Sequence, residues 1–189
     1  MRRVAIAFIS CALLHPCRAN AQSGAPFDFA RTSFTSVHRY VANDAIPRQL
    51  ALPPNLIAPG IYRPLVESML RGSSTFRRQC MRIAAEPGLT VQLVIGWVPV
   101  RTNIRAMTTI KRTREGQLSA LVQIGRKQNV EELIAHEIEH IIEQLDGVDL
   151  AAYAGRRGTG VVAVGYSADM FETRRAKRAG VKVSSELRR

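Results

Sequence analysis

The apolar residues between Leu65 and Ile83 recur at the spacing of a helix. The positions lie four, seven, four and three residues apart, and they are Leu65, Met69, Phe76, Cys80 and Ile83. We therefore predict a helix over this segment, broken at residues 72–74 (GSS) and ended by Pro87-Gly88. Cys80 falls on the apolar side of that helix and is predicted to be a core thiol.

Runs of apolar and β-branched residues predict strands in the middle of the chain. Residues 89–95 (LTVQLVI) are typical of a buried strand. Residues 107–113 (MTTIKRT) and 117–124 (QLSALVQI) flank Glu115-Gly116 and predict a hairpin. Residues 161–166 (VVAVGY) indicate a further short strand.

Helical periodicity returns between residues 129 and 147. Four apolar side chains share about 60° of a helical projection, and they belong to Ile134, Ile138, Ile141 and Leu145. Asn129 followed by Glu132 is typical of a capping box that opens a helix. Gly147 is typical of the residue that ends one.

A last helix is predicted to begin with Ser167 as its N-cap and to end before Gly180. Asp169 in its first turn and the basic residues of 174–178 (RRAKR) near its end match the helix dipole. The predicted fold class is α+β, with a small, mostly antiparallel sheet, the helix over 129–147 and this C-terminal helix.

The first twenty-one residues have the three parts of a secretory signal peptide of bacterial type. Arg2 and Arg3 precede an apolar run of eleven residues, and Ala19-Asn20-Ala21 supplies a cleavage site. That run is too short for a bilayer-spanning helix of ~20 residues. A lipoprotein signal with Cys17 as its acceptor is the alternative, and His15-Pro16 stand where small residues would precede it. We therefore expect an exported protein, periplasmic or extracellular, whose mature form has no transmembrane segment.

The mature chain divides into an arm and a domain. Four of the nine prolines fall within residues 53–64, and their spacing excludes a long helix or a central strand there. We predict an irregular, proline-rich arm over residues 22–63 and one folded domain over residues 64–189. Cleavage of the signal leaves Cys80 as the single cysteine, so no intramolecular disulfide can form.

The formal net charge of +12 is a feature shared with proteins that bind nucleic-acid phosphates. The basic residues are scattered along the chain, however, and the aromatic residues available for stacking are one Trp, four Tyr and six Phe. We therefore expect no specific nucleic-acid partner.

Acidic residues concentrate in one segment of this basic chain. Seven of the fifteen lie between residues 129 and 150, where the sequence contains no Lys or Arg. Glu143 and Asp146 fall in the last turn of the predicted helix, where the dipole disfavours a negative charge by ~0.3–1 kcal/mol. A bound cation would offset that repulsion, as would arginines from elsewhere in the chain. The segment therefore predicts a cation site or a hub of salt bridges.

Two histidines lie on the same helix, on the side opposite the isoleucines. His136 and His140 are four residues apart, so both imidazoles can reach one cation. Residues 136–140 (HEIEH) have the form H-E-x-x-H, in which the two histidines bind Zn²⁺ and the glutamate acts as general base.

This motif on a helix behind a small sheet resembles that of the zincin metallopeptidases. The resemblance covers the motif and the order of elements from about Leu65 onward, and the proline-rich arm lies outside it. It implies that His136 and His140 bind Zn²⁺ and that Glu137 is the general base. It also implies hydrolysis of a peptide or amide bond, with a peptide or protein as the substrate.

The zincin subclasses differ in their third ligand. In the gluzincin arrangement a later helix supplies a Glu, and Glu172, which comes 32 residues after His140, fits that pattern. Asp146 stands where the metzincin pattern has its last His, as in a snapalysin-like variant, but Glu143 stands where that pattern has Gly. Glu143 is a third option, although a role in orienting His140 suits it better. The thiolate variant of peptide deformylases would need Cys80, whose surroundings (RRQCMRI) do not resemble that motif.

The resemblance also implies an oxyanion stabiliser and a strand that pairs with substrate. Tyr166, Tyr153 and Arg156 are available for the first role, and residues 117–124 are expected to be an edge strand for the second. The alternative function is that of a non-catalytic, zincin-shaped protein that binds a metal or a partner. Glu137 favours catalysis, because a structural zinc site needs no base and closes its fourth position with protein.

Overall fold

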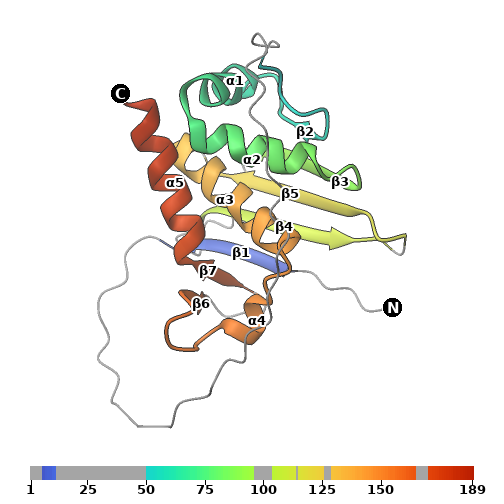
Figure 1. The fold of residues 1–189 in the computed structure, drawn as a ribbon, viewed down its shortest axis with the longest axis vertical. Helices are drawn as coiled ribbons and strands as arrows, with labels where there is room; N and C mark the ends of the chain where they lie inside the picture. Colours follow the sequence, from blue (N-terminus) through green and yellow to red (C-terminus); the bar gives the residue numbers. More distant parts are fainter. Residues whose placement is uncertain (1–5, 12–49, 96–103, 114, 126–128, 165–169) are drawn as a thin grey trace, which may run out of the picture. The chain divides into compact units, whose positions relative to one another are not determined.

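A five-stranded sheet lies at the centre of the fold (Figure 1). The structure is a computed structural model, and it describes residues 6–11, 50–95, 104–113, 115–125, 129–164 and 170–189. In sheet order, the strands are β1 (Ile6–Cys11), β4 (Ile104–Arg112), β5 (Leu118–Ile124), β3 (Leu89–Ile95) and β2 (Leu56–Ile57).

The sheet is mixed, so the expectation of a mostly antiparallel sheet is wrong, although the α+β class holds. The β1–β4 and β4–β5 pairs are antiparallel, whereas the β5–β3 and β3–β2 pairs are parallel. The reason is that β5 inserts between β4 and β3, and its antiparallel pairing with β4 leaves it running in the direction of β3.

The predicted hairpin is confirmed. It joins β4 to β5 through a turn in which the Thr113 amide donates to the Gln117 carbonyl at 2.8 Å, and Gly116 takes a φ of 86°. The predicted strand over residues 89–95 is also confirmed as β3. Residues 117–124 are not an edge strand, however, because β5 has a hydrogen-bonded neighbour on each side. An extended substrate therefore cannot pair with it.

Two helices replace the single broken helix predicted between residues 65 and 83. They are α1 (Arg63–Gly72) and α2 (Ser74–Ala84), and the break falls at Ser73, whose hydroxyl accepts from the Phe76 amide to cap α2. Cys80 is buried in the core, as predicted.

The cap of α2 is reinforced from the far end of the chain. Ser73, Ser74 and Thr75 all donate hydrogen bonds to the carboxylate of Glu186. Burial acts to raise the pKa of Glu186, but these hydrogen bonds outweigh it and lower the pKa from 4.5 to about 2.

We expect Glu186→Gln to lower the free energy of unfolding by about 1 kcal/mol near neutral pH, since this carboxylate is largely solvated. Because the folded-state pKa is depressed, the contribution is present above pH 4.5 and is lost as the pH falls toward 2. Urea unfolding at several pH values would show the difference between wild type and variant shrinking in acid. A difference independent of pH would contradict this explanation.

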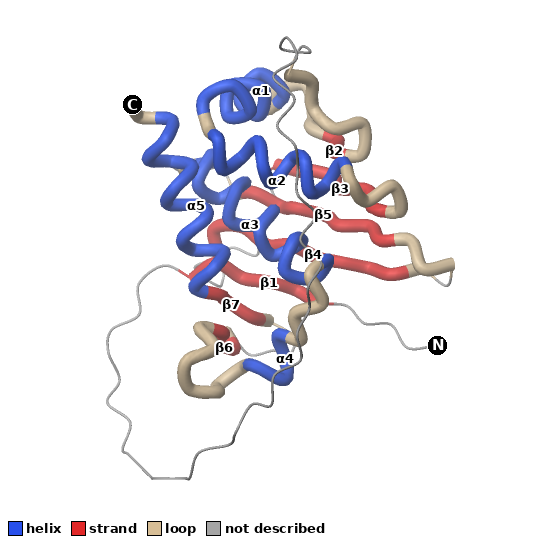
Figure 2. The backbone as a smooth tube through the Cα atoms, in the orientation of Figure 1, coloured by secondary structure: helices blue, strands red, loops and turns tan. Residues whose placement is uncertain are grey.

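Helix α3 (Val130–Leu145) lies between the sheet and two other helices. It packs on β4 and β5 with one side, while α2 and the last helix, α5 (Arg174–Leu187), cover the rest of it (Figure 2). The predicted stripe of Ile134, Ile138 and Ile141 is buried in the core. A short helix, α4 (Leu150–Tyr153), and a separate two-stranded sheet, β6 (Val161–Ala163) and β7 (Phe171–Thr173), connect α3 to α5.

The ends of α3 agree only in part with the prediction. Asn129 is the N-cap residue, but it adopts a left-handed conformation with a φ of 64° and makes no side-chain cap, so the capping box with Glu132 is wrong. Gly147 follows the last turn with a φ of 74°, a conformation that favours glycine.

The bounds predicted for the last helix are wrong at both ends. Its N-cap is Thr173, whereas Ser167 and Asp169 lie outside the described residues. Glu172 therefore sits in β7 and not in the helix. The helix also runs past Gly180, because this glycine packs directly against α3 and does not end the helix.

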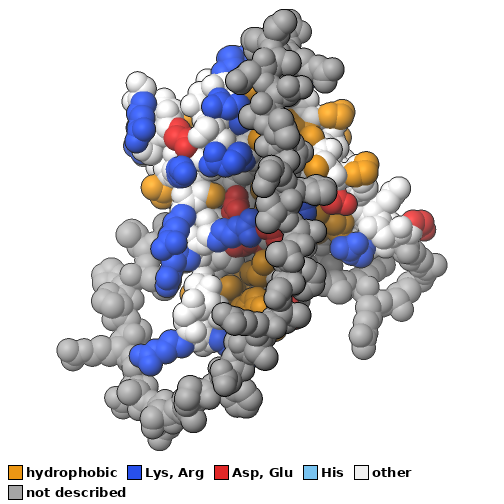
Figure 3. Space-filling model, in the orientation of Figure 1, with side chains coloured by type: hydrophobic (Ala, Val, Ile, Leu, Met, Phe, Trp, Pro, Cys, Tyr) orange, Lys and Arg blue, Asp and Glu red, His pale blue; other side chains and the backbone are white. Residues whose placement is uncertain are grey.

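The outward face of α5 is basic. Exposed side chains of Arg174, Lys177, Arg178 and Lys182 line it, and Figure 3 shows Lys and Arg side chains gathered over this helix. The opposite face of the same helix meets the acidic residues of α3. The basic side chains on the outward face of α5 thus lie on the side of this helix that is turned away from the carboxylates of α3.

The segment predicted as a signal peptide contributes β1, which pairs with the outer edge of β4. The cleavage site at Ala19-Asn20-Ala21 and most of the predicted arm lie outside the described residues; Leu50 to Arg63 are described and include the two-residue β2. Cleavage after Ala21 stays a prediction, and it would leave β4 as the edge strand. Within the described ranges, no helix combines the length and apolarity that a membrane span requires.

Candidate metal centre

The polar side of α3 is buried and does not face solvent. His136 is 4 % exposed, and Glu137 and His140 are 0 % exposed. Helix α5 and strand β7 lie over this side, which turns the acidic face expected from the sequence into an interior. Polar groups in such a place need specific partners, because burying them unpaired costs free energy.

Two histidines and one carboxylate converge here. The Nε2 atoms of His136 and His140 lie 3.2 Å apart, and the Oε1 atom of Glu172 lies 3.2 Å from the first and 3.9 Å from the second. A tetrahedral Zn²⁺ with bonds of ~2.0–2.1 Å holds its ligand atoms about 3.3 Å apart. Two of the three separations match this value, and the third, 3.9 Å, is longer, so a small shift of one side chain would bring all three atoms to one small dication.

Glu172 reaches the histidines from β7, a strand anchored by the buried side chain of Phe171. Its Oε1 atom accepts from the backbone amide of Thr173 at 2.8 Å. Its Oε2 atom is buried without a hydrogen-bond partner. An unpaired buried carboxylate oxygen beside two imidazoles is a further sign of a cation at this position.

Glu143 lies behind His140 and not among the three converging atoms. Its Oε2 atom is 2.9 Å from the Nδ1 atom of His140, and its Oε1 atom accepts from the Thr173 hydroxyl at 2.7 Å. A carboxylate only accepts hydrogen bonds, so it places the imidazole proton on Nδ1 and leaves Nε2 as the unprotonated nitrogen, the form that binds a metal. This geometry fits orientation of His140 better than direct ligation.

Asp146 forms salt bridges with two arginines. It lies 2.8 Å from Arg175 and 3.7 Å from Arg82, at the half-exposed end of α3. Arg175 also contacts Glu139 at 2.7 Å. The outer carboxylates of the acidic segment thus form the hub of salt bridges that was one of the two predictions for it, while the cation site stays a prediction.

Glu137 points toward the sheet. Its Oε2 atom accepts from the hydroxyl of Thr108, on β4, at 2.8 Å, while its Oε1 atom is buried without a partner. Burial raises the pKa of this carboxyl group and Glu172 adds to the rise, whereas His136, His140 and the Thr108 hydrogen bond act to lower it. The net direction of the shift is upward.

The pKa of His136 is shifted upward as well. Burial acts to lower it, but the Glu172 hydrogen bond and the negative charges of Glu137, Glu172 and Glu143 together outweigh burial. This excess of negative charge around buried imidazoles is what a bound dication would neutralise.

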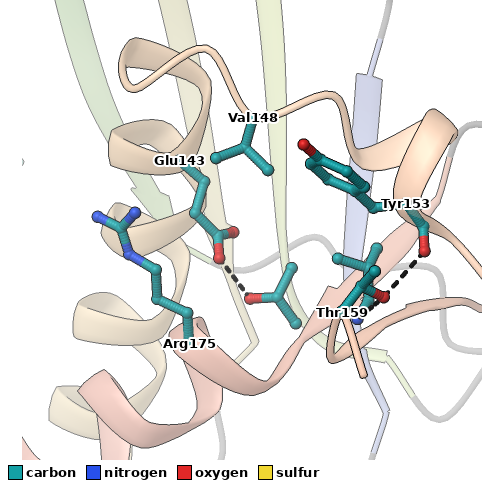
Figure 4. A pocket seen from close by; sticks show the side chains of 7 residues that line it. Glu143, Val148, Tyr153, Thr159 and Arg175 are labelled. Carbon is teal, nitrogen blue, oxygen red and sulfur yellow. Dashed lines mark hydrogen bonds between the residues drawn. The ribbon is translucent and has the colours of Figure 1, made fainter. Parts of the chain in front are cut away.

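Two of the three residues predicted as oxyanion stabilisers are described, and both are exposed. Tyr153, 43 % exposed, lines a pocket of about 270 Å³ with Val148, Thr159 and Glu143 (Figure 4), and Glu143 also contacts His140. Arg156 is exposed in the loop after α4, and Tyr166 lies outside the described residues. Their role in catalysis stays a prediction.

Cys80 takes no part in this centre. It lies in the hydrophobic core, where burial raises the pKa of its thiol to about 12. The ligand atoms that converge belong to His136, His140 and Glu172, so the geometry of the described residues favours a carboxylate over the thiolate of Cys80.

Sequence reasoning missed the two threonines that hold the carboxylates. Thr108 lies in the middle of a strand, and nothing in its neighbourhood marks it as a partner of Glu137. Thr173 could have been found, because a threonine followed by RRAKRA is typical of a helix N-cap. Recognising that cap would have placed Glu172 just outside the helix.

Comparisons of the chain with protein-family models, with curated proteins and with solved structures found no match.

Proposed function

We propose that this protein is a zinc-dependent hydrolase, a metallopeptidase with a zincin-like fold. The observation that carries the proposal is the convergence of His136, His140 and Glu172 from two separate elements, with their ligand atoms all within 4.8 Å of one another. If the H-E-x-x-H pattern had arisen by chance on a solvent-exposed helix, no buried carboxylate would be expected beside both imidazole rings.

Each of the chain's groups has a defined task in this proposal. His136, His140 and Glu172 hold the ion, Glu143 orients His140, and Glu137 accepts and returns a proton. When bound, zinc supplies an activated water and polarises the substrate carbonyl. Three protein ligands leave one tetrahedral position open, which is the arrangement of catalytic and not of structural zinc sites.

The proposed substrate is an extended peptide that pairs with β4. This strand carries Thr108, the partner of Glu137, and its outer edge would be free in a chain that lacks residues 1–21. An extended peptide can add to such an edge through main-chain hydrogen bonds. Strand β4 thus replaces residues 117–124 as the proposed substrate strand.

A second candidate function is that of a non-catalytic protein with the same metal site. The observation that favours it is the complete burial of Glu137. A general base has to become accessible to water and substrate, so Glu137 could act as one only after it has been exposed. Zinc binding without any turnover would support this candidate.

We expect the purified protein to hold about one zinc per chain, and Glu172→Ala to weaken zinc binding at least about 100-fold. Two imidazoles alone leave half of a tetrahedral site to water, so the variant loses its anionic ligand. Competition with a chromophoric chelator would measure the affinities. Asp146→Ala is the matched control, because it removes a carboxylate of the same segment that contacts arginines. Loss of zinc from Asp146→Ala and not from Glu172→Ala would overturn the assignment.

A further inference from the structure

Thr173 joins the two carboxylates of the candidate metal centre. Its side chain donates to Oε1 of Glu143 at 2.7 Å, and its backbone amide donates to Oε1 of Glu172 at 2.8 Å. It also caps α5, because its hydroxyl accepts from the Ala176 amide at 2.9 Å. The residue is 3 % exposed, so water cannot take over these contacts.

The hydroxyl gives these contacts a fixed direction. A threonine hydroxyl has a single hydrogen to donate, and here that hydrogen goes to Glu143 while the lone pairs face the helix amide. The series of hydrogen bonds therefore runs from the first turn of α5 through Thr173 and Glu143 to His140. The Ala176 amide and the Thr173 hydroxyl donate in the direction of Glu143, and the Nδ1–H of His140 donates to the same carboxylate from the other side.

We propose that Thr173 is a positioning residue that aims His140 and Glu172 at one metal ion. Its side chain fixes the carboxylate that orients His140, while its main chain fixes the carboxylate of the third ligand. This inference rests on the proposed zinc site. It assigns a task to a residue that a bare motif search would treat as an ordinary helix cap.

The competing explanation is that Thr173 only caps α5. An N-cap contributes about 0.5–2 kcal/mol to stability, and its loss alone would not change the geometry of His140, which belongs to α3. The two explanations differ in what they predict for metal affinity at equal folding. They also differ in whether Thr173 and Glu143 act through one another.

The test compares Thr173→Val and Thr173→Ser in the mature chain, with Ser73→Ala as the matched control. Ser73 is also a buried N-cap with a carboxylate partner, but it caps α2, whose N-terminus contacts Glu186 and not the metal centre. Chelator competition would give the zinc affinity, and the visible spectrum of the Co²⁺-substituted protein would report ligand geometry. Circular dichroism would confirm that each variant is folded.

We expect Thr173→Val to weaken zinc binding roughly 10- to 100-fold and to alter the Co²⁺ spectrum, as loss of a ligand's supporting hydrogen bond does. Thr173→Ser should restore both, and Ser73→Ala should change neither. Unchanged affinity and spectrum in a folded Thr173→Val protein would overturn the proposal. A wild-type chain that binds no zinc would overturn the proposed function as well, so the two failures are distinguishable.

A second variant covers the case in which Thr173→Val does not fold. Glu143→Gln removes the same connection from its other end and leaves the cap of α5 in place. If Thr173 acts through Glu143, Glu143→Gln should weaken zinc binding about as much as Thr173→Val is expected to. Zinc binding that is unaffected by Glu143→Gln would also contradict the proposed role of Thr173.

Discussion

Glu137→Gln should remove hydrolysis while leaving zinc bound. We expect kcat to fall by about 10²–10⁴-fold, because the amide keeps the shape of the side chain but cannot accept a proton. Zinc content should stay at the wild-type level, since Glu137 points to Thr108 and its oxygens are not among the three converging ligand atoms. Hydrolysis of casein or of a broad peptide library, measured beside elemental analysis, would test both halves of this expectation.

The matched control for that variant is Glu139→Gln, on the same helix. Glu139 contacts Gln79 and Arg175 at the rim of the acidic segment, so its loss should leave turnover within a few-fold of wild type. Equal activity in Glu137→Gln and wild type would exclude Glu137 as the base. If the wild-type protein binds zinc but cleaves no substrate, the second candidate function, a non-catalytic metal-binding protein, would be supported instead.

Gly180→Ala should lower both the stability and the zinc affinity of the protein. A Cβ atom at Gly180 would lie 2.7 Å from the carbonyl oxygen of Glu132 and 3.2 Å from the Cβ atom of His136. The first contact is with backbone, which cannot rotate away, so α5 must move off α3. We expect a loss of about 1–3 kcal/mol in the free energy of unfolding, although alanine favours a helix by up to 1 kcal/mol over glycine.

The displaced helix would carry Glu172 away from His136, since β7 leads directly into α5. We therefore expect zinc affinity to fall by about tenfold or more. Gly72→Ala is the control, because its Cβ atom would meet only the end of the Leu187 side chain, which can move. Thermal unfolding with and without a chelator would separate the loss of stability from the loss of zinc affinity. A Gly180→Ala protein as stable as wild type would show that α3 and α5 can accommodate the extra methyl group.

The sequence predicted the elements whose signals are local. The apolar intervals around Phe76, the hairpin turn at Gly116 and the apolar stripe of α3 each follow from short-range patterns, and all three are confirmed. The histidine spacing on α3 is of the same kind, because four residues make about one turn of any helix.

Long-range pairing was not predictable in this way. Nothing in residues 117–124 shows that this strand inserts between β3 and β4, since a run of apolar residues suits an edge and a centre alike. Gly180 was read as a helix end because glycine commonly has that role, whereas here tertiary contact with α3 explains it. The resemblance to the gluzincins implied Glu172 as the third ligand on a later helix. It lies in β7 instead, because the cap of α5 comes six residues later than sequence reasoning placed it.

The order of the ligands along the chain bears on how the protein assembles. His136 and His140 belong to a helix packed on the main sheet, but Glu172 comes from the last eighteen residues of the chain, together with α5. The centre is therefore incomplete until the C-terminal segment has docked, and a chain truncated before β7 has no site to fill. A metal held there would fasten the C-terminal segment to α3, so that chelation should first release α5 to amide exchange while the main sheet stays protected.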